Sequence, residues 1–269
     1  MNYITTNHQG GLCNTLFKLS AAISMALDND VDYVFSNEFV RPYHPDCPKP
    51  GYDPDYGVFK DNIYRNIEFI EKLPWDYIKY DERGFSYNDI TYTKGTNLLL
   101  NGYFQSEKYF INNKDYIINL FKPTEEIIET ITSQIEDIQN SISIHVRRGD
   151  YLNLPNYHPQ QPIDYYKTAV NYFGMEKNYI IFSDDLDGAM NMLDFIPNKK
   201  PLSFGKDYLD LYAISLCEHN IICNSTFGWW GAYLNSNQNK IVIGPKLWFG
   251  PNLSNHDTKD IIPEGWITM

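Results

Sequence analysis

The strongest constraint on the fold is a regular alternation of short apolar segments with helical patterns that begins at residue 141. The segments SISIHV, NYIIFS, IIC and KIVIG read as strands, and amphipathic segments such as PIDYYKTAVNYF and KDYLDLYAISLCEHN separate them. Strands that alternate with helices predict a parallel sheet with helices on both faces. We therefore expect the second half of the chain to be an α/β domain.

The first half shows the same pattern less regularly. We expect strands at 3–6, 31–36 and 96–104 and helices over 12–30, 106–121 and 122–138, the last with Thr124 as its N-cap. Residues 40–95 are rich in Pro, Tyr, Asp and Asn and show little periodicity, so we expect loops, short helices and a few edge strands there. A length of 269 residues suits two compact halves, and we expect them to be 1–130 and 131–269.

Composition excludes several classes of protein. A formal net charge of -12 argues against a broad basic surface for nucleic acid, so any anionic ligand must meet a local basic site. No stretch approaches 18 consecutive apolar residues, and the first residues lack the pattern of a secretion signal. The four cysteines show no metal-ligand spacing. These features predict a cytoplasmic protein with reduced thiols and no integral membrane segment.

The segment HVRRGDY places two arginines where the first strand of the second half should end. Ligands of open α/β sheets bind beyond the carboxyl ends of the strands. Arg147 or Arg148 could hold phosphate oxygens bidentately, Gly149 allows a sharp turn, and His145 should project from the same strand face as Arg147. The structural alternative is a surface salt bridge, for example between Arg148 and Asp150.

Polar residues also follow two later strands of this half. After IIC, Asn224 or Ser225 is a suitable N-cap, and the unpaired N–H groups of a helix start attract phosphate. After NYIIFS, Asp184 or Asp185 could accept hydrogen bonds from a ribose or from guanine. The alternatives are a helix that packs closely on the sheet, in which Gly228 would serve packing, and simple helix capping by the acids.

A glycine pair in the first half, Gly10 and Gly11, lies between a predicted strand and a predicted helix. It permits close approach of the backbone to a ligand but lacks the complete GxGxxG spacing. Asn14 would lie in the first turn of the following helix.

These four stretches, together with a fifth in the middle of the chain, resemble the α-1,2-fucosyltransferase family of GDP-fucose-dependent, HxRRGD-motif glycosyltransferases. The segments GGLCNTLFKL, NGYFQSEKYF, HVRRGDY, YIIFSDD and CNSTFGWWGAYLN carry the resemblance, in the family's order and over residues 10–245. The resemblance implies an α/β, GT-B-like fold of two facing Rossmann-like halves with parallel sheets. It also implies inverting transfer of L-fucose from GDP-β-L-fucose to a glycan, to O2 of a terminal β-galactoside, without a metal ion.

The resemblance further implies roles for individual residues. The C-terminal half holds GDP-fucose and the N-terminal half holds the glycan acceptor. Arg147 binds the diphosphate, and Asn14 contacts the donor near the reaction centre. Apart from the resemblance, the chemistry calls for a general base to take the acceptor proton; Asp150 is the candidate, and the alternative is that it orients Arg148. The remaining donor-binding residues are Gly10, Gly11, His145, Arg148, Asp184, Asp185, Asn224, Ser225, Thr226 and Phe227, one of the two acids reading guanine.

The sequence departs from the family pattern at Cys13 and Thr15, where glycine and glutamine are usual. Both positions flank Asn14, so the departures bear on the acceptor side and on the linkage made. Two rival functions remain open. One is a metal-dependent GT-A glycosyltransferase that uses Asp185 and Asp187 with another nucleotide sugar. The other is a non-catalytic module that binds a nucleotide sugar or a glycan.

Overall fold

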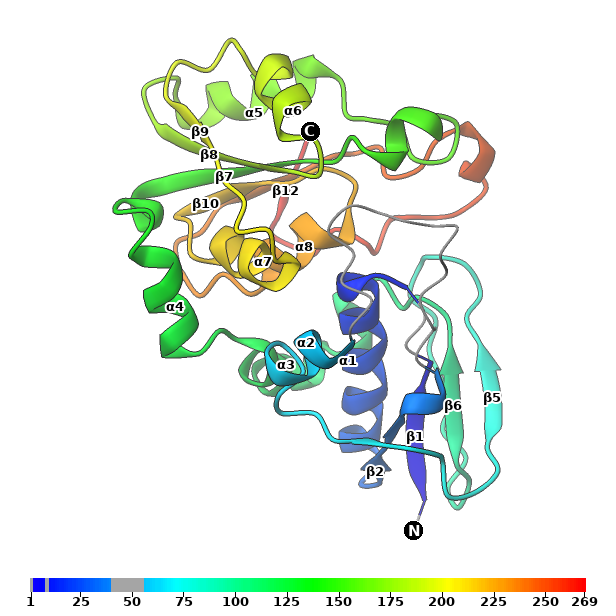
Figure 1. Cartoon of the computed structure of the whole chain (residues 1–269). Helices are drawn as coiled ribbons and strands as arrows, with labels where there is room; N and C mark the ends of the chain where they lie inside the picture. The colour runs from blue at the N-terminus through cyan, green and yellow to red at the C-terminus, as the bar shows by residue number, and fades with distance from the viewer. Residues whose placement is uncertain (1, 8–9, 40–55) are drawn as a thin grey trace. The chain divides into compact units, whose positions relative to one another are not determined.

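The structure is a computed structural model that describes residues 2–7, 10–39 and 56–269 (Figure 1). The chain divides into two compact units: unit 1 comprises Met1–Lys122 and His256–Pro263, and unit 2 comprises Pro123–Asn255 and Glu264–Met269. The boundary expected after residue 130 falls inside the helix α4 (Glu125–Thr132), which belongs to unit 2.

Unit 1 is built on a four-stranded parallel sheet in the order β2-β1-β6-β5. Its strands are β1 (Tyr3–Thr6), β2 (Asp32–Tyr33), β5 (Ile78–Asp81) and β6 (Leu98–Asn101). The helix α1 (Leu12–Asp28) packs against β1, and every residue from its start to Ala26 is buried except Asn14. Asn14 is therefore the one polar side chain in this stretch of the helix that stays partly accessible.

Residues 31–36, expected to form one strand, divide between two sheets. The first part pairs with β1 as β2, and the second part, β3 (Phe35–Ser36), pairs with β4 (Phe69–Ile70). The rings of Phe35 and Phe69 pack at 6.0 Å between centroids, which turns the chain away from the main sheet. The expected strand is thus confirmed at 32–33 and 35–36, but it is divided between two sheets. A 3-10 turn η1 (Asn37–Phe39) and the helix α2 (Tyr56–Asp61) complete this part of unit 1.

The single helix expected over 106–121 is wrong, because the chain leaves helical geometry at Phe110. This residue has φ -143° and a fully buried ring. Burying the ring is therefore more favourable than continuing the helix. Two 3-10 turns, η2 (Glu107–Tyr109) and η3 (Ile111–Asn113), precede the helix α3 (Lys114–Phe121).

The segment His256–Pro263 returns from unit 2 and completes unit 1. Asp260 is buried, and its carboxylate accepts hydrogen bonds from Lys108 Nζ at 2.5 Å and from the Tyr87 backbone N–H at 2.9 Å. The His256 ring meets the Phe85 ring edge to face at 5.1 Å. Residues distant in sequence therefore fix the loop that follows β5.

Unit 2 contains a six-stranded parallel sheet in the order β12-β11-β10-β7-β8-β9. From the central pair, one run of strands proceeds outward through β7, β8 and β9 and the other through β10, β11 and β12. This is the doubly wound order, with its switch point between β7 and β10. The strands are β7 (Ser141–Val146), β8 (Asn178–Ser183), β9 (Lys199–Pro201), β10 (His219–Ile221), β11 (Val242–Gly244) and β12 (Ile267–Thr268).

Helices cover both faces of this sheet, with α5 and α6 on one side and α7 and α8 on the other (Figure 1). Thr124 caps α4 as expected, since its hydroxyl accepts from the Ile127 N–H. Trp229 and Trp230 on the helix that follows β10 are fully buried. The remaining helices and 3-10 turns are η4 (Ile138–Asn140), η5 (Asp150–Asn153), α5 (Ile163–Phe173), α6 (Leu186–Met192), α7 (Asp207–Ser215), α8 (Thr226–Tyr233) and η6 (Pro251–Leu253).

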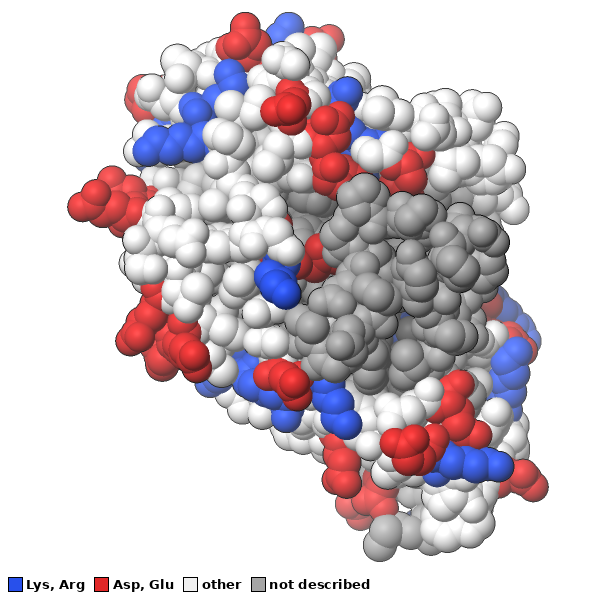
Figure 2. Space-filling model, viewed as in Figure 1, with Lys and Arg blue, Asp and Glu red and all other residues white. Residues whose placement is uncertain are grey.

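The α/β class with parallel sheets is thus confirmed in both units. On the face drawn in Figure 2, Lys and Arg side chains are interspersed with Asp and Glu and form no continuous basic surface among the described residues. Among those residues, too, no helix combines the length and the apolar character that crossing a membrane requires.

Candidate functional site

The arginine pair lies at the switch point of unit 2. All six residues of β7 are buried, and Arg147 and Arg148 follow directly at its carboxyl end. β10 pairs with β7 through Ile144 and Ile221, so the residues after both strands leave the sheet at the same edge. In doubly wound sheets this is the edge at which ligands bind.

Two carboxylates hold the Arg147 side chain. Its Nε and Nη2 atoms lie 3.1 and 2.7 Å from Asp150 Oδ1, and its Nη1 atom lies 3.1 Å from Asp184 Oδ2. The guanidinium carbon also lies 5.7 Å from the centre of the Tyr151 ring. Burial alone would lower the pKa of Arg147, but the charges of Asp184 and Asp150 raise it above the ordinary value. Arg147 is therefore a permanent, oriented cation.

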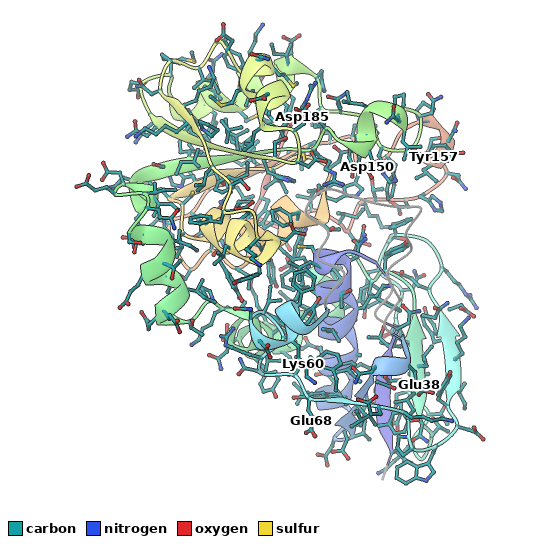
Figure 3. All side chains as sticks on the ribbon, viewed as in Figure 1. Glu38, Lys60, Glu68, Asp150, Tyr157 and Asp185 are labelled. Carbon is teal, nitrogen blue, oxygen red and sulfur yellow. The ribbon has the colours of Figure 1, made fainter. Side chains whose placement is uncertain are left out.

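Arg148 has a separate set of partners. Its Nε atom donates to Asp185 Oδ2 at 2.8 Å, and its Nη1 atom donates to Gln160 Oε1 at 3.0 Å. The hydrogen bond from Arg148, followed by one from the Gly188 N–H, lowers the pKa of Asp185. The alternative pairing of Arg148 with Asp150 is therefore wrong: consecutive side chains diverge, and Asp150 lies on the side of Arg147. Figure 3 marks Asp150 at η5 and Asp185 ahead of α6.

Asp184 connects the two arginines. Besides its contact with Arg147, its Oδ1 atom accepts from the Arg148 backbone N–H at 2.9 Å. A Cβ atom on Gly149 would overlap Asp184 Oδ2, so only glycine allows the carboxylate to come this close. The strand register explains the contact, because Val146 pairs with Ser183 and the next residue of each strand follows at the same edge.

His145 is buried beneath the arginines and is neutral. Burial, and then the charge of Arg147, lowers its pKa to about 3. Its Nδ1 atom lies 3.3 Å from Cys223 Sγ, and its ring lies 5.4 Å from that of Phe227. A Cβ atom on Gly228 would come within 2.8 Å of His145 Nδ1, so close packing accounts for this glycine in α8.

The turn between β10 and α8 is held by a buried asparagine. Asn224 Nδ2 donates to the carbonyl oxygens of Pro159 and Trp248, both at 3.0 Å, and Asn224 Oδ1 accepts from Gln161 Nε2 at 2.9 Å. Ser225 is the N-cap of α8, whereas Thr226 and Phe227 are only half-buried at the start of the helix. Gln161 was not anticipated, because nothing in its sequence context marks it.

The N-terminal motif has its own arrangement within unit 1. Gly10 adopts φ +129°, which favours glycine, and Gly11 is the N-cap of α1. Asn14 Oδ1 accepts a hydrogen bond from Gln105 Nε2 at 3.0 Å. Gln105 belongs to the segment GYFQS, so two of the sequence motifs meet at this hydrogen bond.

The fold places the chain in the GT-B-like class of α/β proteins. It resembles the crystal structure of the fucosyltransferase NodZ from Bradyrhizobium with a TM-score of 0.54 and 12% identity, over 86% of this chain and 92% of that one. The NodZ α-1,6-fucosyltransferase soaked with GDP-fucose gives a TM-score of 0.55 and 13% identity, over 87% and 93%. At these identities the likeness concerns the fold.

The chain belongs to glycosyl transferase family 11, whose model matches residues 54–269. It is 34% identical over 182 residues to the O-antigen biosynthesis glycosyltransferase WbnK of Escherichia coli, covering 62% of this chain and 59% of that protein. It is 27% identical over 225 residues to an α-1,2-colitosyltransferase of Escherichia coli, covering 79% and 76%. A galactoside 2-α-L-fucosyltransferase of Caenorhabditis elegans is 31% identical over 163 residues, covering 54% and 44%. These matches confirm the resemblance drawn from the five motifs.

Proposed function

We propose that this protein is an inverting glycosyltransferase that moves L-fucose from GDP-β-L-fucose to O2 of a terminal β-galactoside in a glycan. Family membership supports transfer of a sugar, and the names of two relatives support an α-1,2 linkage. The observation that carries the proposal is Arg147, a guanidinium held by two carboxylates at the switch point of a doubly wound sheet.

In this proposal Arg147 binds the diphosphate of the donor. A guanidinium has five N–H donors. Asp150 accepts two of them, from Nε and Nη2, and Asp184 forms an ion pair with Nη1 at 3.1 Å. The N–H groups that Asp150 does not use remain for phosphate oxygens. When the bond to fucose breaks, negative charge develops on the departing GDP, and a fixed cation stabilises it without reorganisation. The step uses no metal ion.

The geometry changes the roles proposed for the acids. Asp150 accepts a hydrogen bond from Arg147 Nη2. We therefore assign it to orienting this arginine and not to removing the acceptor proton. Asp184 holds Arg147 as well. Asp185 has the more exposed side chain of the two, at 34% against 24% for Asp184, and it is the acid that we assign to guanine.

The start of α8 completes the proposed donor site. Ser225, Thr226 and Phe227 surround its first N–H groups, which favour phosphate oxygens. Both the nitrogen and the oxygen of the Asn224 side chain form hydrogen bonds within the protein, so we assign it to fixing this turn. His145 assists by packing against Phe227, and Arg148 by anchoring the turn after β7. Gly10, Gly11 and Asn14 remain the predicted contacts near the reaction centre.

The experiment is to incubate the protein with GDP-fucose and a panel of β-galactosides, lactose among them, and to determine the linkage of the product by NMR. We expect GDP release that depends on acceptor and a fucosyl α-1,2-galactoside product. A second arm replaces GDP-fucose with GDP-colitose, because one relative is named for colitose transfer. A preference for another sugar nucleotide would overturn the assignment of the donor.

The same assay separates the rival functions. A binding module would bind GDP-fucose without releasing GDP at any acceptor concentration. A metal-dependent GT-A enzyme would lose activity in excess chelator. The GT-B-like fold already speaks against that rival.

A further inference from the structure

A second polar edge lies in unit 1, where β1, β6 and β5 end side by side. Lys18 Nζ donates to Asn7 Oδ1 at 2.8 Å, Asn7 Nδ2 donates to Asn101 Oδ1, and Asn101 Nδ2 donates to Asp81 Oδ1 at 2.5 Å. A chain of hydrogen bonds thus crosses the carboxyl ends of three parallel strands. This is the edge at which parallel sheets bind ligands, yet the proposed donor residues of unit 2 use none of it.

The loop that follows β6 is fixed to this edge by Glu82. Its carboxylate accepts from the backbone N–H of Tyr103 at 2.6 Å and from that of Phe104 at 2.9 Å. A Cβ atom on Gly102 would overlap Glu82, so the close approach requires glycine. Phe104 has the left-handed φ of +52° and a fully buried ring. The buried ring and the two hydrogen bonds together hold the loop in one conformation.

The loop presents Tyr103 as an exposed but ordered ring. Tyr103 is 44% exposed, and its ring stacks on that of Phe85 with 5.9 Å between centroids and 16° between planes. The ammonium of Lys18 lies 5.0 Å from the Tyr103 centroid. Two residues further on, Gln105 donates to Asn14. One rigid loop therefore carries both an exposed aromatic ring and the partner of the motif asparagine.

The charges at this edge favour a neutral ligand. Asp81 pairs with Lys79 at 2.7 Å, and the charge of Glu82 acts on the buried Lys18, whose pKa burial lowers to about 8. At this edge each acidic side chain therefore has a cation near it. Among its described residues the edge has no surplus of cations to bind a phosphate group.

We propose that Tyr103 is the platform on which a pyranose ring of the glycan acceptor stacks. The face of an aromatic ring is electronegative, and the C–H groups on one face of a galactopyranose are weakly positive and apolar. The sugar can stack by this face while its hydroxyl groups meet the amide and carboxylate groups of the same edge. The inference rests on the proposed function, since it supplies the acceptor site for that reaction.

Direct binding tests the platform without turnover. Saturation-transfer NMR is measured with lactose, N-acetyllactosamine and methyl β-galactoside on the wild type and on Tyr103→Ala, Tyr103→Phe and Tyr77→Ala. Tyr77 is the matched control because it is 42% exposed and lies at the amino end of β5. We expect binding by the wild type, Tyr103→Phe and Tyr77→Ala, and its loss in Tyr103→Ala. A wild type that binds none of the three sugars, or a Tyr103→Ala variant that binds them normally, overturns the proposal.

Kinetics separate the platform from the proposed reaction. Loss of an aromatic contact should raise the acceptor KM by about tenfold, with the KM for GDP-fucose unchanged, in Tyr103→Ala only. If transfer occurs and this acceptor KM equals that of the wild type, the platform is wrong and the proposed function stands. If no transfer occurs but lactose binding still depends on Tyr103, the proposed reaction is wrong and the platform stands.

Discussion

Replacing Arg147 with alanine should lower turnover by about 10²- to 10³-fold while the protein stays folded. The guanidinium is the cation that the proposed reaction requires, and its removal leaves the GDP charge without a fixed partner. Loss of a preorganised electrostatic donor costs about 10²- to 10³-fold in rate, or roughly 3–4 kcal/mol. Arg147→Lys should not restore activity, because one ammonium cannot contact Asp150, Asp184 and a phosphate in the planar geometry of the fork.

The cost in stability should be much smaller. The side chains of Asp150 and Asp184 are 31% and 24% exposed, so water can solvate both once Arg147 is gone. Partly exposed ion pairs contribute up to about 1 kcal/mol each, so the free energy of unfolding should fall by about 1–2 kcal/mol. For a chain of this size that corresponds to roughly 2–4 °C of melting temperature per kcal/mol.

The assay is GDP release from GDP-fucose with saturating acceptor, measured well below the melting temperature of each variant and beside a calorimetric scan. The matched control is Lys167→Ala, which removes an exposed cation and its 3.7 Å pair with Asp164 on α5. The control should keep full activity. An Arg147→Ala protein with wild-type kcat and donor KM would refute the reasoning, and so would a loss of activity that merely tracks unfolding.

Gly149→Ala should lower kcat/KM by about tenfold or more with a folded far-UV spectrum, because its Cβ would displace the Asp184 carboxylate that holds Arg147. The folded-state pKa of His145 is about 3 against an ordinary 6.5, so the unfolded chain binds a proton that the native protein does not. The free energy of unfolding should therefore fall as the pH falls from about 6.5 towards 3, and it should fall less steeply in His145→Gln. The measurement is urea unfolding at several pH values, and an equal dependence of the free energy of unfolding on pH in the two proteins would contradict this. Transfer should persist in excess EDTA, and activity that returns only with added Mn²⁺ or Mg²⁺ would restore the metal-dependent alternative.

Much of the fold of unit 2 could be predicted because short stretches of its sequence specify their own secondary structure. The alternation after residue 141 specifies strands and helices, and the polar residues follow the strands at the edge where ligands bind. What could not be predicted is the pairing of charges. Arg147 meets Asp184 because β7 and β8 pair in the register that joins Val146 to Ser183, and a single sequence does not state a register.

Unit 1 was harder to predict because its contacts override local preference. Phe110 interrupts a helical pattern to bury its ring, and Phe35 leaves one sheet to pack in another. Asn14 and Gln105 are 91 residues apart, so neither motif alone indicates their hydrogen bond. The parts of 40–95 that the structure describes hold the short helix α2 and the edge strand β5, in line with the short helices and edge strands expected there, although the polar sequence of β5 did not indicate its bounds. Cys47 lies outside the described residues.

The return of His256–Pro263 to unit 1 limits how this protein can be dissected. A fragment that stops at Lys122 would lack Asp260 and leave Lys108 and the Tyr87 N–H without their carboxylate. Chimeras that exchange one half between relatives therefore need junctions on both sides of this segment as well as after Lys122. A library of single-crossover hybrids should yield mostly insoluble protein. Hybrids that take His256–Pro263 and the rest of unit 1 from the same parent should fold to soluble protein.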